Sequence, residues 1–123
     1  MTPPPSAVRV LVVEDEALVA MLVEDALLDA GYEVIGPARS VAEAMAMLAS
    51  ERPAAAVLDL NLGGENSLRV ADELSARGIP FIVATGYGAG GLPPHYDEVL
   101  VLPKPYDPAD LTAALGRLCQ APR

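Results

Sequence analysis

Charged and hydroxyl side chains follow four apolar segments of strand length. They are Glu14-Asp15, Asp59, Thr85 and Lys104. Because the carboxyl ends of parallel strands meet at one edge of a sheet, we expect these side chains to lie together. Carboxylates at adjacent strand ends repel, since two unit charges ~4 Å apart cost about 4 kcal/mol at an effective dielectric constant of 20. The cluster therefore needs a cation, and a few oxygen ligands with room for water suit Mg²⁺.

The same residues could also bind a phosphoryl group. A Mg²⁺ ion held by two carboxylates keeps coordination positions open for a substrate phosphoryl group. Lys104 can neutralise one phosphoryl oxygen as a point charge, and the Thr85 hydroxyl can donate a hydrogen bond to another. Asp59 then remains as the nucleophile for an aspartyl phosphate, a known use of carboxylates.

Each of these residues also has a purely structural interpretation. Asp59 could close a loop through an Asx-turn. The Glu14-Asp15 pair could sit at a helix start, where the helix dipole favours acids. Thr85 is a common residue type at strand ends, and Lys104 could be a solvated charge. The occurrence of all of them at one sheet edge favours the functional interpretation.

The segments between these residues alternate between strand and helix patterns. Continuously apolar or β-branched runs predict strands at residues 8–13, 32–35, 54–58, 80–84 and 98–102. Apolar residues at helical spacing predict helices at residues 17–30, 41–52, 68–77 and 108–119. Alternating strands and helices indicate an α/β fold with a doubly wound parallel sheet. Five strands favour the flavodoxin-like order 2-1-3-4-5, which places the first and third strands side by side.

Polar residues mark the starts of three helices. Ser40 and Glu43 form a capping box. Ser67 is expected to cap the third predicted helix, and Asp107 to cap the last one ahead of Pro108. The 86–94 region, in contrast, contains four glycines and two prolines, so we expect a loop with at most one turn near His95 and Tyr96. The fourth helix of the expected fold is therefore weak or absent.

The first predicted helix is expected to have one buried and one exposed apolar side. The buried stripe comprises Val19, Leu22, Val23, Ala26, Leu27 and Ala30. Leu18, Met21 and Leu28 lie off this stripe, on the helix that follows the acidic pair. Exposed apolar residues at such a place suit the helical surface of a partner protein.

Composition limits the classes of partner. The chain has 123 residues, with 8 basic and 17 acidic side chains and a net charge of −9. This charge argues against nucleic acid as a partner, because a protein needs a basic surface to bind it. It also argues against binding to anionic membranes. Cys119 is the single cysteine, which fits a reducing cytoplasm. We expect neither a signal peptide nor a membrane span, and one cytoplasmic domain at residues 8–119 with tails at 1–7 and 120–123.

The whole chain resembles a response-regulator receiver domain of bacterial two-component signalling, the CheY-like form of this fold. The matching motifs are Val12-Val13-Glu14-Asp15-Glu16, Val57-Leu58-Asp59-Leu60-Asn61-Leu62, Ala84-Thr85-Gly86 and Lys104-Pro105. The resemblance implies that Asp59 accepts a phosphoryl group from a histidine kinase or phosphotransfer protein. It implies a Mg²⁺ site of Glu14, Asp15, Asp59 and Asn61, in which Asp15 binds the ion directly, Glu14 acts through water, and Asn61 contributes its backbone carbonyl. It also implies a cis Lys104–Pro105 bond and a signalling domain rather than an enzyme.

Two departures from the usual receiver pattern indicate a subgroup. Val101 stands where the fifth strand normally carries a Tyr or Phe, and the fourth helix is interrupted by glycine and proline. Together with Tyr87 after Thr85-Gly86, they resemble single-domain receivers with a Phe-Ala-Thr-Gly-hydrophobic-Tyr motif, served by kinases of the HWE or HisKA2 class. We expect phosphorylation to change the 85–106 region, with ordering of residues 86–97. The output protein is not identified by the sequence, and we expect a monomer or weak dimer.

Three competing functions remain open at this point. A flavin or nucleotide binder of the same fold would need a glycine- or hydroxyl-rich phosphate loop where Glu14-Asp15-Glu16 stands. A haloacid-dehalogenase-like phosphatase would need an aspartate where Asn61 stands. A receiver-like interaction module that is never phosphorylated would not need the complete acid, threonine and lysine set.

Overall fold

A five-stranded parallel sheet forms the centre of the protein. The computed structural model describes residues 8–85, 96, 99–104 and 106–119. The sheet strands are β1 (Arg9–Val13), β2 (Glu33–Ala38), β3 (Ala55–Asp59), β6 (Phe81–Thr85) and β7 (Leu100–Pro103), in the order β2-β1-β3-β6-β7. Since β4 and β5 form a separate small hairpin, this is the predicted order 2-1-3-4-5. The flavodoxin-like fold is confirmed.

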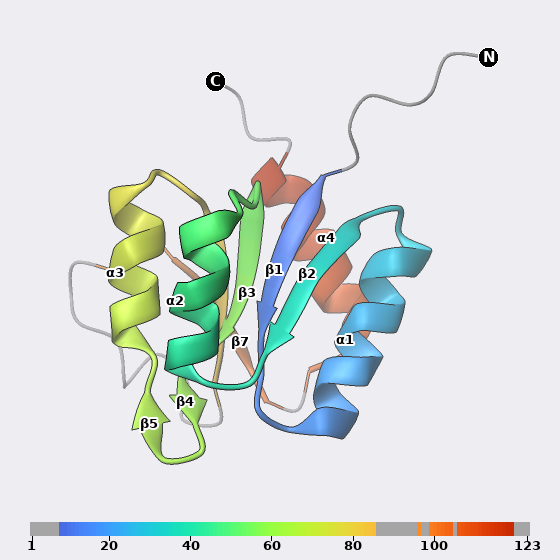
Figure 1. Cartoon of the computed structure of the whole chain (residues 1–123). Helices are drawn as coiled ribbons and strands as arrows, with labels where there is room; N and C mark the ends of the chain where they lie inside the picture. Colours follow the sequence, from blue (N-terminus) through green and yellow to red (C-terminus); the bar gives the residue numbers. More distant parts are fainter. Residues whose placement is uncertain (1–7, 86–95, 97–98, 105, 120–123) are drawn as a thin grey trace.

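Helices cover both faces of the sheet. They are α1 (Ala17–Asp29), α2 (Val41–Ser50), α3 (Leu68–Ala76) and α4 (Pro108–Cys119). Figure 1 shows α2 and α3 on one face and α1 and α4 on the other. A hydrophobic core lies on each face of the sheet, and alternate residues of β1 point into each one. Leu11 and Val13 pack toward α2 and α3, whereas Val10 and Val12 pack toward α1 and α4. This two-sided burial explains why the strand is continuously apolar.

The second strand is longer than the predicted segment 32–35. The structure continues β2 through Gly36 and Pro37 to Ala38. Gly36 has φ of 97°, and a Cβ there would lie 2.7 Å from the Ala38 nitrogen, so glycine is required. The pairing with β1 shifts register at this point, and Val13 pairs with Ala38. The Glu14 N–H then donates to the Ala38 carbonyl at 2.9 Å, so the added residues help to position Glu14.

The fifth sheet strand begins later than predicted. β7 starts at Leu100 instead of residue 98. The Val99 N–H donates to the Tyr96 carbonyl at 3.1 Å, so this amide is not available to a sheet partner. Residues 86–95, 97–98 and 105 lie outside the described residues, as do both predicted tails. The predicted loss of the fourth helix, the ordering of residues 86–97 and the cis Lys104–Pro105 bond therefore stay predictions.

A hairpin follows β3, in a segment for which the sequence predicted neither a strand nor a helix. β4 (Asn61–Leu62) and β5 (Glu65–Asn66) pair antiparallel around Gly63 and Gly64. These glycines have φ of 59° and 88°, and positive φ at both central residues is what a two-residue type I′ turn requires. The hairpin lies below α2 and α3 in Figure 1.

Two of the three predicted helix caps are confirmed. The Ser40 Oγ accepts the Glu43 N–H at 3.1 Å, and the Asp107 side chain accepts the Ala109 N–H at 2.9 Å. The prediction for Ser67 is wrong, because its side chain makes no cap hydrogen bond. The Asn66 side chain accepts the Leu68 N–H at 2.7 Å in its place.

The buried stripe of α1 is narrower than predicted. Ala20, Val23 and Leu27 are the residues of this helix that are buried against the sheet. Leu22 is 49% exposed, so its assignment to the core is wrong, as is that of the exposed Ala30. The helix contacts the sheet along one line of residues spaced three and four apart. Leu22 lies to the side of that line and faces the segment before α4.

Candidate functional site

Three carboxylates converge at the carboxyl ends of the two central strands. Glu14 and Asp15 follow β1, and Asp59 ends β3, which pairs directly with β1. Each residue offers one oxygen, and these oxygens lie within 4.8 Å of one another. Glu14 and Asp59 are 3% and 5% exposed. This is the one such group found among the described residues, and it contains three of the residues that the sequence singled out.

Lys104 reaches this cluster from the end of β7. Its Nζ lies 2.9 Å from Asp59 Oδ2 and 3.1 Å from Glu14 Oε1. The Lys104 N–H donates to the Thr85 carbonyl at 2.9 Å, which ties the lysine backbone to the end of β6. Burial alone would lower the pKa of Lys104, but hydrogen bonds to Asp59 and Glu14 outweigh it and raise the pKa above its usual value. The lysine is therefore a fixed positive charge beside Asp59.

Burial of the acidic cluster costs electrostatic energy. The pKa of Glu14 is raised from 4.5 to about 7, and desolvation by burial is the largest of several causes. The hydrogen bond from the Glu16 N–H lowers this pKa, and the charge of Asp59 raises it further. A carboxylate that is disfavoured as an anion at neutral pH gains stability from a nearby cation. Three carboxylate oxygens at one pocket are also the ligand type that Mg²⁺ prefers, so the donor set fits this ion.

The Asp59 carboxylate is held on both oxygens. Oδ2 contacts the Lys104 ammonium, and Oδ1 accepts the Asn61 N–H at 3.2 Å. Thr85 ends the adjacent strand, one residue beyond Ala84, which is the register partner of Asp59. Thr85 is 2% exposed. The structure thus places all the predicted residues at one sheet edge, although Asn61 belongs to the hairpin and its side chain points to Gly64 rather than to Asp59.

The site opens to solvent through a pocket of about 570 Å³. Its lining residues are Asp15, Glu16, Asp59, Asn61, Gly63, Gly64 and Lys104. Negatively charged oxygens and one ammonium group line the same opening, which has room for a metal ion, water and a small anionic group. A Cβ at Gly63 would lie 3.6 Å from Asp15 Oδ2, so the hairpin turn forms one wall beside the carboxylates.

Sequence reasoning missed three residues near the site. Glu16 contacts the Lys104 ammonium at 3.6 Å, although the sequence gave it no role of its own beyond the motif after the first strand. Tyr106 lies near Glu14, and burial together with that negative charge raises its pKa to about 12. Ser67 donates to the Asp59 carbonyl. Glu16 was visible as the third acid of a triplet, whereas the sequence marked Ser67 only as a helix cap and gave no signal for Tyr106.

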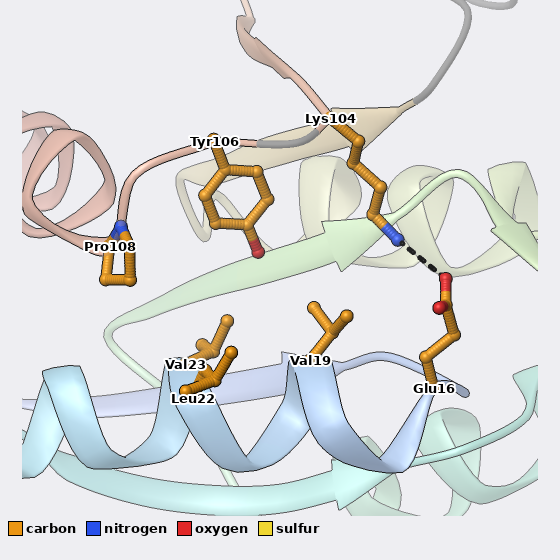
Figure 2. Close-up of a pocket in the computed structure, with 7 residues that line it drawn as sticks. All are labelled: Glu16, Val19, Leu22, Val23, Lys104, Tyr106 and Pro108. Atoms are coloured by element: carbon orange, nitrogen blue, oxygen red, sulfur yellow. Dashed lines mark ion pairs between the residues drawn. The ribbon is translucent and has the colours of Figure 1, made fainter.

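A second pocket lies beside this site, between α1 and the segment before α4. Figure 2 shows Val19, Leu22 and Val23 of α1 opposite Tyr106 and Pro108, with the Glu16–Lys104 ion pair at one end. The cavity has a volume of about 390 Å³. Leu18 and Met21, which are 65% and 50% exposed, continue the apolar surface along α1. The apolar surface therefore begins directly at the acidic site.

The fold and this site define a class of signalling domain. The family model for the response regulator receiver domain matches residues 10–116. The chain belongs to the response regulator receiver domain family of two-component signalling. Receiver domains bind Mg²⁺ at an acidic pocket, and the group formed by Glu14, Asp15 and Asp59 is consistent with such a pocket.

Relatives of known sequence or structure support this assignment. The chain is 33% identical over 115 residues to the phyllosphere-induced regulator PhyR of Methylorubrum extorquens, covering 90% of this chain and 43% of PhyR. It is 29% identical to the transcriptional regulatory protein PdtaR of Mycobacterium tuberculosis, covering 87% of this chain and 54% of PdtaR. The solution structure of SdrG from Sphingomonas melonis is similar, with a TM-score of 0.79 and 38% identity over 93% of this chain and 98% of SdrG. The chain spans about half the length of the curated relatives it matches.

None of the helices in the described part of the chain is both long and apolar enough to cross a membrane.

Proposed function

We propose that Asp59 is the phosphoacceptor of this receiver domain. The observation that carries this proposal is the geometry around its carboxylate, with Lys104 Nζ at 2.9 Å and an oxygen of both Glu14 and Asp15 within 4.8 Å. A carboxylate at the mouth of a pocket, beside a fixed cation and a group suited to Mg²⁺, is placed for attack on an anionic phosphoryl group.

The donor in this proposal is a phosphohistidine of a histidine kinase or phosphotransfer protein. An Asp59 oxygen forms a bond to phosphorus while the phosphorus–nitrogen bond breaks and its electron pair returns to the imidazole. Asp15 and the Asn61 carbonyl would hold Mg²⁺ directly and Glu14 through water. A Mg²⁺ ion held by these residues would neutralise charge on the phosphoryl oxygens and orient the group. Lys104 then exchanges its contact with Asp59 for a phosphoryl oxygen, and the Thr85 hydroxyl donates to another.

The response to phosphorylation is proposed to begin at Thr85 and Lys104. Phosphorylation adds about −1.5 to −2 charges at the end of β3. Thr85 ends β6, and its carbonyl accepts the Lys104 N–H, so movement of either residue is transmitted to the backbone of β7. The proposed readout is a change of the 85–106 region, which backbone amide chemical shifts with and without beryllofluoride would detect. Unchanged shifts over residues 86–97 would reject the ordering of that segment.

The partner surface is proposed to be the exposed apolar side of α1 with the adjoining pocket. Leu18, Met21 and Leu28 are at least half exposed, and they lie on the same helix as Val19, Leu22 and Val23, which line the pocket. The helices of a histidine kinase or phosphotransfer protein would bury this surface while presenting the phosphohistidine to Asp59. An HWE or HisKA2 kinase is the proposed class, on the strength of the motif after β6.

Intact mass spectrometry after incubation with acetyl phosphate and Mg²⁺ tests the phosphoacceptor. We expect a single phosphoryl adduct on the wild-type chain, none on Asp59→Asn, and a normal adduct on Asp25→Asn, which alters an exposed acid of α1. No adduct on the wild type would favour a receiver-like module that is not phosphorylated. An adduct that persists in Asp59→Asn would place the acceptor elsewhere.

A further inference from the structure

Ser67 is a fully buried polar residue whose hydroxyl does not serve the helix that it precedes. Its Oγ donates to the Asp59 carbonyl oxygen at 2.6 Å, eight residues earlier in the chain. The first turn of α3 receives its side-chain cap from Asn66. The hydroxyl is therefore committed to the end of β3, where the proposed phosphoacceptor lies.

Ser67 binds two consecutive carbonyl groups. Besides the bond from Oγ, the Ser67 N–H donates to the Leu60 carbonyl at 2.9 Å. The peptide group between Asp59 and Leu60 is held at its other end as well, because the Leu60 N–H donates to the Ala84 carbonyl at 3.1 Å. The next peptide group ends in the Asn61 N–H, which donates to Asp59 Oδ1. Both peptide groups after Asp59 are thus fixed at their oxygen and their nitrogen.

The neighbouring hairpin accounts for the bond from the Ser67 N–H, because Leu60 and Ser67 are the next pair in its register, but it does not account for the bond from the Ser67 hydroxyl. The β4–β5 hairpin has its own pairs, Asn61 with Asn66 and Leu62 with Glu65. Its turn is closed by the Gly64 N–H, which donates to the Asn61 side chain at 2.9 Å. The Ser67 hydroxyl adds nothing to these contacts, and it donates its hydrogen bond to the residue that carries the reactive carboxylate.

We propose that Ser67 is a positioning residue for phosphoryl transfer to Asp59. By fixing the two peptide groups after Asp59, it directs the Asn61 N–H toward the Asp59 carboxylate. It also sets the Asn61 backbone, whose carbonyl is a metal ligand in the proposed function, on which this inference rests. Residues that orient a metal ligand or a reacting group in this way are typically worth about 10–100-fold in metal affinity or activity.

The test compares Ser67→Ala with two variants of the same helix. Ser75→Ala removes an exposed hydroxyl, and Val70→Ala opens a cavity in the core without touching any polar contact. The measurements are the rate of phosphorylation by acetyl phosphate with Mg²⁺, the Mg²⁺ dissociation constant, and the amide chemical shift of Asn61. For Ser67→Ala we expect a rate about tenfold lower, Mg²⁺ affinity about tenfold weaker, and a shifted Asn61 amide signal. Both comparison variants should keep wild-type rates at a temperature where they are folded.

Several outcomes would overturn the inference. A wild-type rate together with an unmoved Asn61 signal in Ser67→Ala would contradict it. An equal loss of rate in Val70→Ala would also contradict it, because that result would indicate general destabilisation. If Ser67→Ala does not fold, Ser67→Cys takes its place in the test, because cysteine is similar in size to serine and is a weaker hydrogen-bond donor. We expect the rate, the Mg²⁺ affinity and the Asn61 signal to change in the same direction. If the wild-type chain accepts no phosphoryl group, the proposed function fails, whereas the Asn61 signal and the Mg²⁺ affinity still test the positioning role.

Discussion

Lys104 and Asp59 form an ion pair with 2.9 Å between Nζ and Oδ2, although 45 residues separate them in the chain. The same ammonium group contacts Glu14 at 3.1 Å. One lysine ammonium therefore contacts two buried carboxylates, and the lysine side chain is only 19% exposed. This pairing links the end of β7 to the ends of β1 and β3.

Replacement of Lys104 by glutamine is expected to destabilise the protein, and Mg²⁺ should reduce the loss. We expect the free energy of unfolding to fall by about 3 kcal/mol without Mg²⁺, the lower end of the range for breaking a buried pair. Because a divalent ion compensates the same carboxylates, the difference from wild type should shrink in saturating Mg²⁺. Urea unfolding with and without the ion measures both values. Arg69→Gln, an exposed charge of α3, should change stability by less than about 0.5 kcal/mol.

Mg²⁺ binding should itself stabilise the folded chain through Asp15. A ligand at 100 times its dissociation constant adds about 2.7 kcal/mol to the free energy of unfolding. Asp15→Asn should lose most of this gain because it removes one of the three converging carboxylates. The measurement is the midpoint of thermal unfolding across a Mg²⁺ titration, with Asp25→Asn as the control. Equal stabilisation of Asp15→Asn and wild type would contradict the proposed ligand.

Substitution of Leu18 by glutamate should slow transfer from a kinase without affecting small donors. Leu18 is 65% exposed, so the change should leave stability nearly unaltered. We expect the rate of transfer from the cognate phosphorylated kinase to fall about tenfold, equivalent to about 1.4 kcal/mol of docking free energy. Phosphorylation by acetyl phosphate should stay normal. Ala46→Glu, exposed on α2 across the sheet, serves as the control, and a normal transfer rate for Leu18→Glu would remove α1 from the docking surface.

The bond between Tyr96 and Asp72 should make stability depend on pH in the alkaline range. The Tyr96 hydroxyl donates to Asp72 of α3, and its ring packs edge-on against Phe81. Burial together with the Asp72 carboxylate raises the pKa of Tyr96 from 10.0 to about 12. A raised folded pKa stabilises the protein fully below pH 10, and this stabilisation is lost as pH rises from 10 to 12. Tyr96→Phe should cost about 1 kcal/mol at pH 8.

Urea unfolding at pH 8 and pH 11 checks this prediction. The difference between wild type and Tyr96→Phe should narrow at the higher pH, because the wild-type unfolded chain releases a proton that the folded chain retains. Asp72→Ala should lose a similar amount of unfolding free energy at pH 8. The double variant should lose little more unfolding free energy than either single variant. A difference that is independent of pH would contradict the raised pKa.

The sequence predicted the order of the fold because the relevant signals are local. Continuous apolar runs, helical spacing and glycine or proline at segment ends each depend on residues within one segment. The order 2-1-3-4-5 then followed from five strand–helix units. The same logic selected Glu14, Asp15, Asp59 and Lys104, because strand ends can be identified without knowing what lies beside them. Gly36 shows the limit, since β2 continues through a Gly-Pro pair that is typical of a strand end.

Only the tertiary structure decided which partners these residues take. Ser67 has the sequence context of a helix cap, but burial brings its hydroxyl to the Asp59 carbonyl, a nearby acceptor that no local pattern reveals. Leu22 has the spacing of a core residue, yet the line of contact between α1 and the sheet leaves it half exposed. The raised pKa of Glu14 likewise depends on desolvation by surrounding chain segments. Side-chain type and spacing are properties of the chain itself, whereas distance, burial and charge environment are set when remote segments pack together.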